Sequence, residues 1–244
     1  MSSHAKPSLF FFISILIKLG SGLCPSQCKC NESLLRSDCS ESQLEIVPIF
    51  LNPRMKYLEA RRNRIRHLER ALTVYEDLEM LDLSHNEFHS LGQLQFESQS
   101  KLKQLNLSNN FIASLHLSTF EGPQALQTLD LSHNIIGSIE NDTFASLVSL
   151  VELCLSHNKI TFVASGAFEG LSRLRILNLD HNLIEAVDPT WMFSLESLRF
   201  FYLNHNAVTN IVDDSFKPLS ALKVLSMLHN RVKMTFLTYL RFLN

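Results

Sequence analysis

The sequence predicts an α/β solenoid, an elongated stack of short coils that each contribute one β-strand to a common parallel sheet. Three observations support this prediction. The pattern Leu-x-x-Leu-x-Leu-x-x-Asn occurs eight times, with another apolar residue at one or two leucine positions in three of the copies, its copies follow one another about every 24 residues, and no linker interrupts them between residues 54 and 244. A fixed period in the twenties is typical of repeat architectures in which each coil contacts only its neighbours. We therefore expect one elongated body and not a compact globule.

The alternation of residues within each copy predicts the strand. In the second copy, Leu81 and Leu83 alternate with the more polar Asp82 and Ser84. This period of two places the leucines on a buried face and the other residues on an outward face. Equivalent strands about 4.8 Å apart would give a parallel sheet about 34 Å across over the eight copies. We expect its outward face to be concave.

An asparagine ends each copy where the chain leaves the sheet. Its amide is suited to satisfy backbone groups that the turn would otherwise leave unpaired in the interior, so we expect a structural role. The eight positions are Asn63, Asn86, Asn110, Asn134, Asn158, Asn182, Asn206 and Asn230. An apolar column with the same period is expected to fill the convex side of the interior, and it comprises Phe96, Phe120, Phe144, Phe168, Met192, Phe216 and Leu240.

The first 22 residues have the pattern of a secretory signal peptide. His4 and Lys6 precede an apolar stretch at residues 9–17, and small residues follow it, so we expect cleavage after Gly22. A membrane anchor is the alternative. Lys18 argues against it, because it interrupts a stretch shorter than the roughly 20 residues that span a bilayer.

Four cysteines follow closely on the expected cleavage point and predict an N-terminal cap at residues 23–53. They are Cys24, Cys28, Cys30 and Cys39. After a signal peptide, two disulfides are favoured over a zinc site. Each would contribute about 2–4 kcal/mol to a segment with little core of its own. At the other end, Leu240 and Leu243 complete the convex half of the eighth copy, so we expect a truncated array of repeats at 54–244 without a C-terminal cap.

Cap, repeats and signal together resemble the extracellular leucine-rich repeat family. The resemblance implies a horseshoe with a concave parallel sheet, an irregular or short-helical convex side, and disulfides that pair Cys24 with Cys30 and Cys28 with Cys39. A narrower resemblance rests on the segments 39–53, 58–65 and 75–83, which are similar to the capricious- and tartan-type cell-surface recognition proteins of insects. It implies a role in cell recognition or adhesion.

The outward residues of the last strands predict a partner-binding surface. They become larger and less polar there, and arginines flank them: Ile176, Phe200, Tyr202, Val224, Leu228, Arg175 and Arg199. Aromatic and arginine side chains on a rigid surface are the usual anchors of protein interfaces. We expect an extracellular or cell-surface protein to dock there. The alternative is that later repeats or a dimer cover this patch.

Three sequons and one further cysteine are candidates for modification. The sequons begin at Asn31, Asn106 and Asn141, and a glycan on Asn106 would shield the N-terminal half of the sheet unless that sequon is unused. Cys154 points outward and has no partner left in the chain. It predicts either a disulfide-linked dimer or a free thiol.

Two clusters of ionisable residues have competing interpretations. A histidine precedes the repeat asparagine in six copies, at His85, His133, His157, His181, His205 and His229. Such a column could bind a metal ion or repel itself near pH 6, but plain strand-end residues are the favoured interpretation. A basic cluster in the first repeat comprises Lys56, Arg61, Arg62, Arg64 and Arg66. It could bind sulfated glycans, although a solvated charged strand is favoured.

The sequence favours a binding module over an enzyme. It contains no nucleotide-binding glycine loop, no His-Glu-x-x-His and no Gly-x-Ser-x-Gly, so we expect no catalysis, cofactor or metal. With 22 basic and 24 acidic residues the net charge is −2, which predicts no nucleic-acid partner. We expect an extracellular protein, secreted as written and held at the cell surface if a longer product carries a membrane anchor. Innate immune recognition and a matrix proteoglycan-like structural role are the alternatives.

Overall fold

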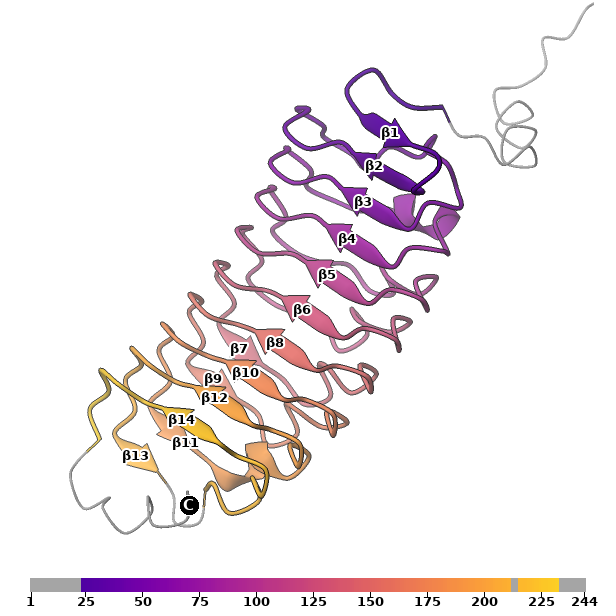
Figure 1. Cartoon of the computed structure of the whole chain (residues 1–244). Helices are drawn as coiled ribbons and strands as arrows, with labels where there is room; N and C mark the ends of the chain where they lie inside the picture. The colour runs from indigo at the N-terminus through magenta and orange to yellow at the C-terminus, as the bar shows by residue number, and fades with distance from the viewer. Residues whose placement is uncertain (1–22, 212–214, 233–244) are drawn as a thin grey trace, which may run out of the picture.

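The computed structural model describes residues 23–211 and 215–232, and over these residues the chain is an elongated, gently curved solenoid (Figure 1). Ten strands form one sheet in the order β1-β2-β3-β4-β5-β6-β8-β10-β12-β14. The predicted solenoid of about eight coils with a parallel sheet is confirmed. The expected signal peptide at 1–22, and Leu240 and Leu243 of the last copy, lie outside the described residues.

Each copy of the repeat supplies one three-residue strand to the sheet. These strands are β3 (Tyr57–Glu59), β4 (Met80–Asp82), β5 (Gln104–Asn106), β6 (Thr128–Asp130), β8 (Glu152–Cys154), β10 (Ile176–Asn178), β12 (Phe200–Tyr202) and β14 (Val224–Ser226). All neighbouring pairs among them are parallel and in register, so that Leu129 lies beside Leu153 and Leu153 beside Leu177. Because the register never slips, residues at one repeat position form continuous rows along the solenoid.

The cysteine-rich cap extends this sheet by two further strands. β1 (Lys29–Asn31) pairs with β2 (Arg36–Asp38) in antiparallel fashion, and β2 pairs with β3 in parallel. Disulfides join Cys24 to Cys30 and Cys28 to Cys39, which is the pairing implied by the family resemblance. The cap thus covers the first coil and also continues its sheet, a feature that the sequence interpretation did not include.

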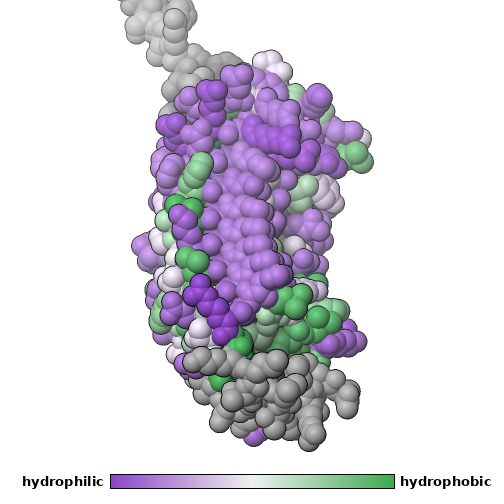
Figure 2. Space-filling view, turned by 90° about the vertical axis from the view of Figure 1, so that its left-hand side faces the viewer, coloured by the Kyte–Doolittle hydropathy of each residue, from purple (hydrophilic) through white to green (hydrophobic). Residues whose placement is uncertain are grey.

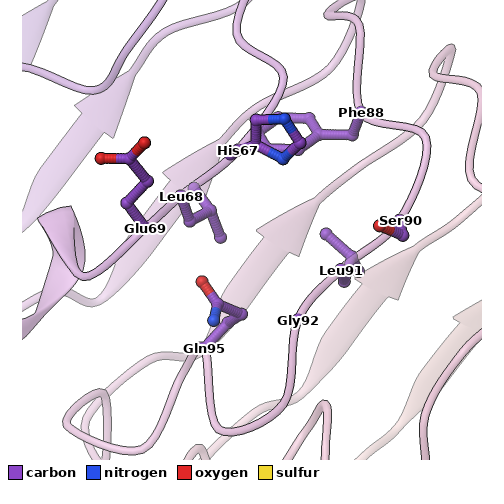
Figure 3. Close-up of a pocket in the computed structure, with 8 residues that line it drawn as sticks. All are labelled: His67, Leu68, Glu69, Phe88, Ser90, Leu91, Gly92 and Gln95. Atoms are coloured by element: carbon purple, nitrogen blue, oxygen red, sulfur yellow. The ribbon is translucent and has the colours of Figure 1, made fainter.

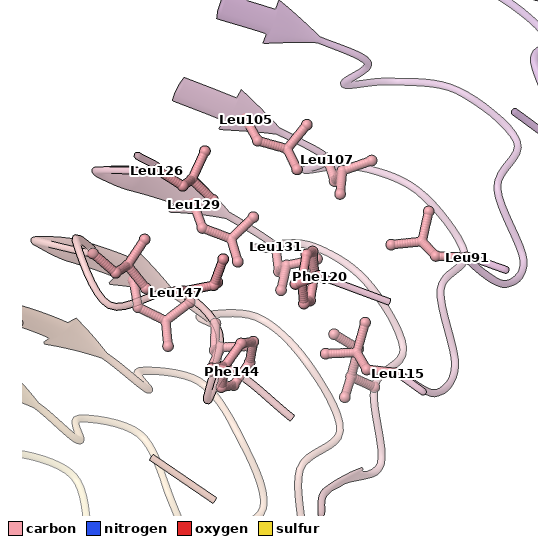
Figure 4. Packing of buried hydrophobic residues seen from close by; sticks show 14 of the residues in the cluster. Leu91, Leu105, Leu107, Leu115, Phe120, Leu126, Leu129, Leu131, Phe144 and Leu147 are labelled. Atoms are coloured by element: carbon pink, nitrogen blue, oxygen red, sulfur yellow. The ribbon is translucent and has the colours of Figure 1, made fainter. Parts of the chain in front are cut away.

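The interior is filled by the inward leucines of the strands and by a stack of phenylalanines (Figure 4). The rings of Phe96, Phe120, Phe144 and Phe168 are buried, and successive ring centroids lie 6.1, 5.8 and 6.4 Å apart. Buried aromatic rings contribute a large apolar area and a preferred offset contact. Each coil is therefore held to the next by the core and by the sheet.

The side opposite the main sheet is irregular. It carries two short parallel pairs, β7 (Ser138–Ile139) with β9 (Phe162–Val163) and β11 (Ala186–Val187) with β13 (Asn210–Ile211), which lie behind the sheet in Figure 1. Two 3₁₀ helices, η1 (Ala71–Val74) and η2 (Pro189–Met192), complete it. No helix among the described residues is long and apolar enough to cross a membrane.

Candidate recognition surface

The repeat asparagines lie buried behind the end of each strand and bind two coils at once. In Asn134, Nδ2 donates to the carbonyl oxygens of Leu131 in its own repeat and Leu107 in the preceding repeat, both at 3.0 Å. Its Oδ1 accepts from the backbone N–H of Ile112 at 3.0 Å. Asn86, Asn110, Asn158, Asn182 and Asn206 make the same set of bonds. These side chains serve the scaffold and leave the outward rows free for recognition.

In the N-terminal half of the sheet, the residues that immediately precede successive strands alternate in charge. Glu79 lies between Lys56 and Lys103, and its carboxylate oxygens are 2.8 and 2.6 Å from the two ammonium groups. Hydrogen bonds from Lys103 and then from Lys56 lower the pKa of Glu79 to about 2. We call these three residues the ionic triplet. Each of the two ammonium groups therefore has a carboxylate partner at neutral pH.

Most of the predicted basic cluster is paired in the same way. Arg62 lies 2.8 Å from a carboxylate oxygen of Glu41, and Arg66 lies 2.9 Å from one of Glu87. Together with Lys56, three of the five cluster members thus have an acidic partner within the chain. Pairing of this kind reduces the positive field available to a sulfated glycan.

In the C-terminal half of the sheet, the first residue of each strand is apolar from β10 onward. The register places Ile176 beside Phe200 and Phe200 beside Val224, so these three residues form a contiguous group that we call the apolar row. Tyr202 lies on the same face, two residues beyond Phe200. Leu228, which follows β14, is 68% exposed. Figure 2 shows hydrophobic surface gathered at this end of the solenoid, beside a long hydrophilic column.

A row of three cations flanks the apolar row. It comprises Arg175, Arg199 and Lys223, which we call the basic row, and all three side chains are exposed. Backbone bonds fix their spacing, because the N–H of Arg199 donates to the carbonyl of Arg175 at 2.9 Å and that of Lys223 to Arg199 at 2.8 Å. The sequence interpretation named the two arginines but missed Lys223. Its position one repeat after Arg199 was the signal that could have identified it.

The histidines form a regular stack along the exposed edge where the strands end. The rings of His133, His157, His181, His205 and His229 lie nearly parallel, with successive centroids 4.2 Å apart. Desolvation and repulsion by neighbouring rings lower the pKa of both His157 and His205. No group of three or more potential ligands in residues 23–211 and 215–232 is arranged to hold a metal ion.

The backbone explains why histidine recurs at this position. Each histidine of the stack adopts a left-handed conformation, with φ between 53° and 56°. Histidine and asparagine are among the residues that tolerate this region best. Asn109, which replaces histidine in the third repeat, has a φ of 55°. A structural reason therefore exists for the column, and the sequence pattern alone did not reveal it.

A small pocket lies near the N-terminal end, in the turns that follow β3 and β4 (Figure 3). Its volume is about 270 Å³, and its lining includes His67, Glu69 and Gln95 around the buried Leu68 and Phe88. No hydrogen bond joins a hydroxyl to His67 or Glu69 among the described residues, as a nucleophile and its base would require. We assign no chemistry to it.

The repeat pattern is also recognised by comparison with known proteins. A family model described as Leucine rich repeat matches five overlapping segments, at residues 76–136, 100–160, 124–184, 149–208 and 172–232. Together these segments extend over more than half of the chain. The chain belongs to the leucine-rich repeat family.

Each similar protein matches only part of this chain, and the matched segment is only part of that protein's own length. Oligodendrocyte-myelin glycoprotein of Homo sapiens is 36% identical over 87 residues, which are 35% of this chain and 20% of that protein. The Mus musculus protein is 34% identical over the same shares. The crystal structure of a TLR13–ssRNA13 complex superimposes with a TM-score of 0.60 and 26% identity, over 72% of this chain and 29% of that one.

The other candidate residues of this leucine-rich repeat chain are Cys154 and the asparagines of the three sequons. Cys154 is a free thiol on β8, half-buried and 3.2 Å from the hydroxyl of Ser156, and burial raises its pKa. Asn31 and Asn141 are exposed. Asn106 is half-buried on β5, and its Oδ1 accepts from both the backbone and the hydroxyl of Ser108. A glycan on Asn106 would stand on the sheet.

Proposed function

We propose that this chain is a non-catalytic extracellular recognition module that binds a secreted or cell-surface protein through the C-terminal half of its sheet, in cell recognition, adhesion or guidance. One observation carries the proposal: the in-register apolar row, with Tyr202 and Leu228, is open on a rigid sheet and flanked by arginines. Exposed apolar groups rimmed by polar ones are typical of protein interfaces. Membership of a repeat family related to a myelin glycoprotein supports an extracellular role.

The proposal also includes the domain bounds, the glycosylation sites and a disulfide-linked dimer. We place the signal peptide at residues 1–22, the cap at 23–53 and the repeats at 54–244, with sequon use at Asn31, Asn106 and Asn141. A kinship with capricious- and tartan-type proteins would fit the adhesion role. A disulfide-linked dimer through Cys154 is testable by non-reducing electrophoresis.

Innate immune recognition is the second candidate function. It is favoured by the structural likeness to TLR13, whose crystal structure contains a single-stranded RNA. Our expectation of no nucleic-acid partner rests on the near-neutral charge of the chain, and it is checked by titrating a labelled single-stranded RNA. A matrix proteoglycan-like role would instead require an attached glycosaminoglycan.

The proposed function is tested with a Phe200→Ala, Tyr202→Ala double variant. The purified chain is screened against a panel of extracellular domains and cell surfaces, and we expect the double variant to lose at least tenfold in affinity for any partner found, because aromatic anchors dominate interfaces. The matched control is Met80→Ala with Gln104→Ala, which truncates the same row on β4 and β5 and should leave binding unchanged. Equal loss in both variants, or none in the first, would reject the C-terminal face as the docking site.

A further inference from the structure

The same row of the sheet carries two opposite arrangements of charge. Near the N-terminus the ionic triplet alternates in sign, and each charge has a partner within 3 Å. Near the C-terminus the basic row holds three cations in succession, and none of them forms an ion pair with a described residue. Three like charges on adjacent strands repel one another unless an anion lies across them. No carboxylate among the described residues forms an ion pair with the basic row, so the row is suited to bind an anionic partner.

The apolar row determines which kind of anion fits. It lies directly beside the basic row, since Ile176, Phe200 and Val224 each follow one of the three cations in sequence. A linear sulfated glycan would satisfy the cations but would leave these side chains uncovered. A protein segment with carboxylates on one stripe and apolar side chains on the next would cover both rows.

The spacing of the rows favours a helix over an extended segment. Strands of a sheet lie about 4.8 Å apart, so the three cations span about 9.6 Å along the solenoid. Residues on one face of an α-helix recur about every 5.4 Å, and two such steps exceed that span by only about 1 Å. Same-face residues of an extended strand recur about every 6.7 Å, and two steps exceed the span by about 4 Å. Flexible arginine and lysine side chains absorb the first mismatch more readily.

We propose that the partner of this surface is an acidic amphipathic helix of another protein, lying along the solenoid axis with carboxylates against the basic row and apolar residues against the apolar row. The inference rests on the proposed function, because it names the chemistry of the partner for that same face. It uses a known mode of recognition, in which a helix lays one face on a complementary surface.

The experiment uses synthetic helical peptides as probes of the whole chain. The first carries a stripe of glutamates beside a stripe of leucines, the second has lysines in place of the glutamates, and the third is a shuffled sequence of the first. Fluorescence anisotropy should show that the first binds at least tenfold more tightly than the other two, and that added salt weakens it. An Arg175→Glu, Arg199→Glu variant should lose that binding at least tenfold.

A matched control changes the same charge elsewhere. Lys159→Glu with Arg231→Glu reverses two exposed cations in the row after the repeat asparagine, off the sheet, and should leave peptide binding unchanged. Equal binding of the shuffled peptide, or full binding by the Arg175→Glu, Arg199→Glu variant, would overturn the acidic helix. So would a heparin oligosaccharide that binds through Arg175 and Arg199 while the glutamate peptide does not.

Partner binding by the two double variants distinguishes a failure of this inference from a failure of the proposed function. A protein partner that is lost in Phe200→Ala, Tyr202→Ala but retained in Arg175→Glu, Arg199→Glu would leave the docking face in place and reject the acidic helix. Retention in both variants would reject the docking face itself. Circular dichroism and thermal melting of each variant confirm that the solenoid is folded, which is expected because all four side chains lie on the surface.

Discussion

The two halves of the sheet share one scaffold and differ in what they present to solvent. In the N-terminal half many outward charges have an oppositely charged partner within the chain, in the ionic triplet and in pairs such as Lys101 with Asp77. In the C-terminal half the outward rows hold apolar side chains and three cations that form no ion pair with a described residue. The difference shows that the repeat fixes where a residue lies, whereas its chemistry varies along the sheet, including at the face where we propose that a partner binds.

A second contrast lies between β12 and earlier strands, in how the turn after the strand is closed. In β4, β5, β6 and β10 the side chain of the last strand residue accepts from the backbone N–H two residues later, as Asp82 does from Ser84 at 2.9 Å. Tyr202 cannot do this, and the N–H of Asn204 instead donates to Asp180 of the preceding repeat at 2.6 Å. Because the neighbouring coil supplies that acceptor, position 202 can hold an aromatic side chain on the proposed docking face.

The largest expected effect tests what the two halves have in common. Asn86→Ala in the N-terminal half and Asn182→Ala in the C-terminal half each remove a buried amide that bonds two coils. We expect each to lower the free energy of unfolding by about 1–3 kcal/mol, since buried backbone groups are left unpaired. Guanidinium denaturation measures both values. A large cost in only one half would show that the scaffold is not uniform.

A smaller effect tests the two ways of closing the turn. Asp82→Ala removes the acceptor of the Ser84 N–H and should cost about 1 kcal/mol in unfolding free energy. Tyr202→Ala removes no such acceptor, so its cost should be about half of that or less, while partner binding decreases. The two costs are compared from the midpoints of guanidinium denaturation, provided that both variants show the same dependence of unfolding free energy on denaturant. If Tyr202→Ala proves the more destabilising of the two, then the ring serves the fold and not the binding face.

The repeat register made most of the scaffold predictable from sequence. Its period placed the strands and the buried columns, because each copy repeats one local solution to packing. The strand pair of the cap was not predictable in this way, since residues 29–38 contain no copy of the pattern from which β1 and β2 could be inferred. Nor was the pairing of charges such as Arg66 with Glu87, because it depends on side-chain positions in neighbouring coils.

The same limit applies to the candidate site. The apolar row was predictable because Ile176, Phe200 and Val224 occupy one repeat position in consecutive copies. The aromatic residue at position 202 depends on a hydrogen bond from the N–H of Asn204 to Asp180 of the preceding coil, which no single copy of the pattern contains. Local periodicity thus identifies rows, while contacts between coils decide what each row can do.

The smallest expected effect is the pH dependence of stability that the histidine stack causes. The stack extends along the strand ends from His133 to His229. Burial, followed by repulsion from the neighbouring rings, lowers the pKa of His157 and of His205, and the Asp180 carboxylate opposes this shift. A base with a lowered pKa in the folded state binds protons more readily when unfolded. Stability is therefore full above the ordinary histidine pKa of about 6.5, and it decreases as the pH falls from there toward the folded value.

We expect the melting temperature to decrease slightly between pH 7.5 and pH 5.5, by less than for any substitution above, because the rings are exposed and salt screens their repulsion. A His157→Asn, His205→Asn variant should keep the fold, since asparagine already occupies the equivalent left-handed position at Asn109, and it should lose most of the pH dependence. A wild-type melting temperature that stays constant over this range would show that stacking at 4.2 Å carries no titration penalty. The column would then be a consequence of backbone geometry alone.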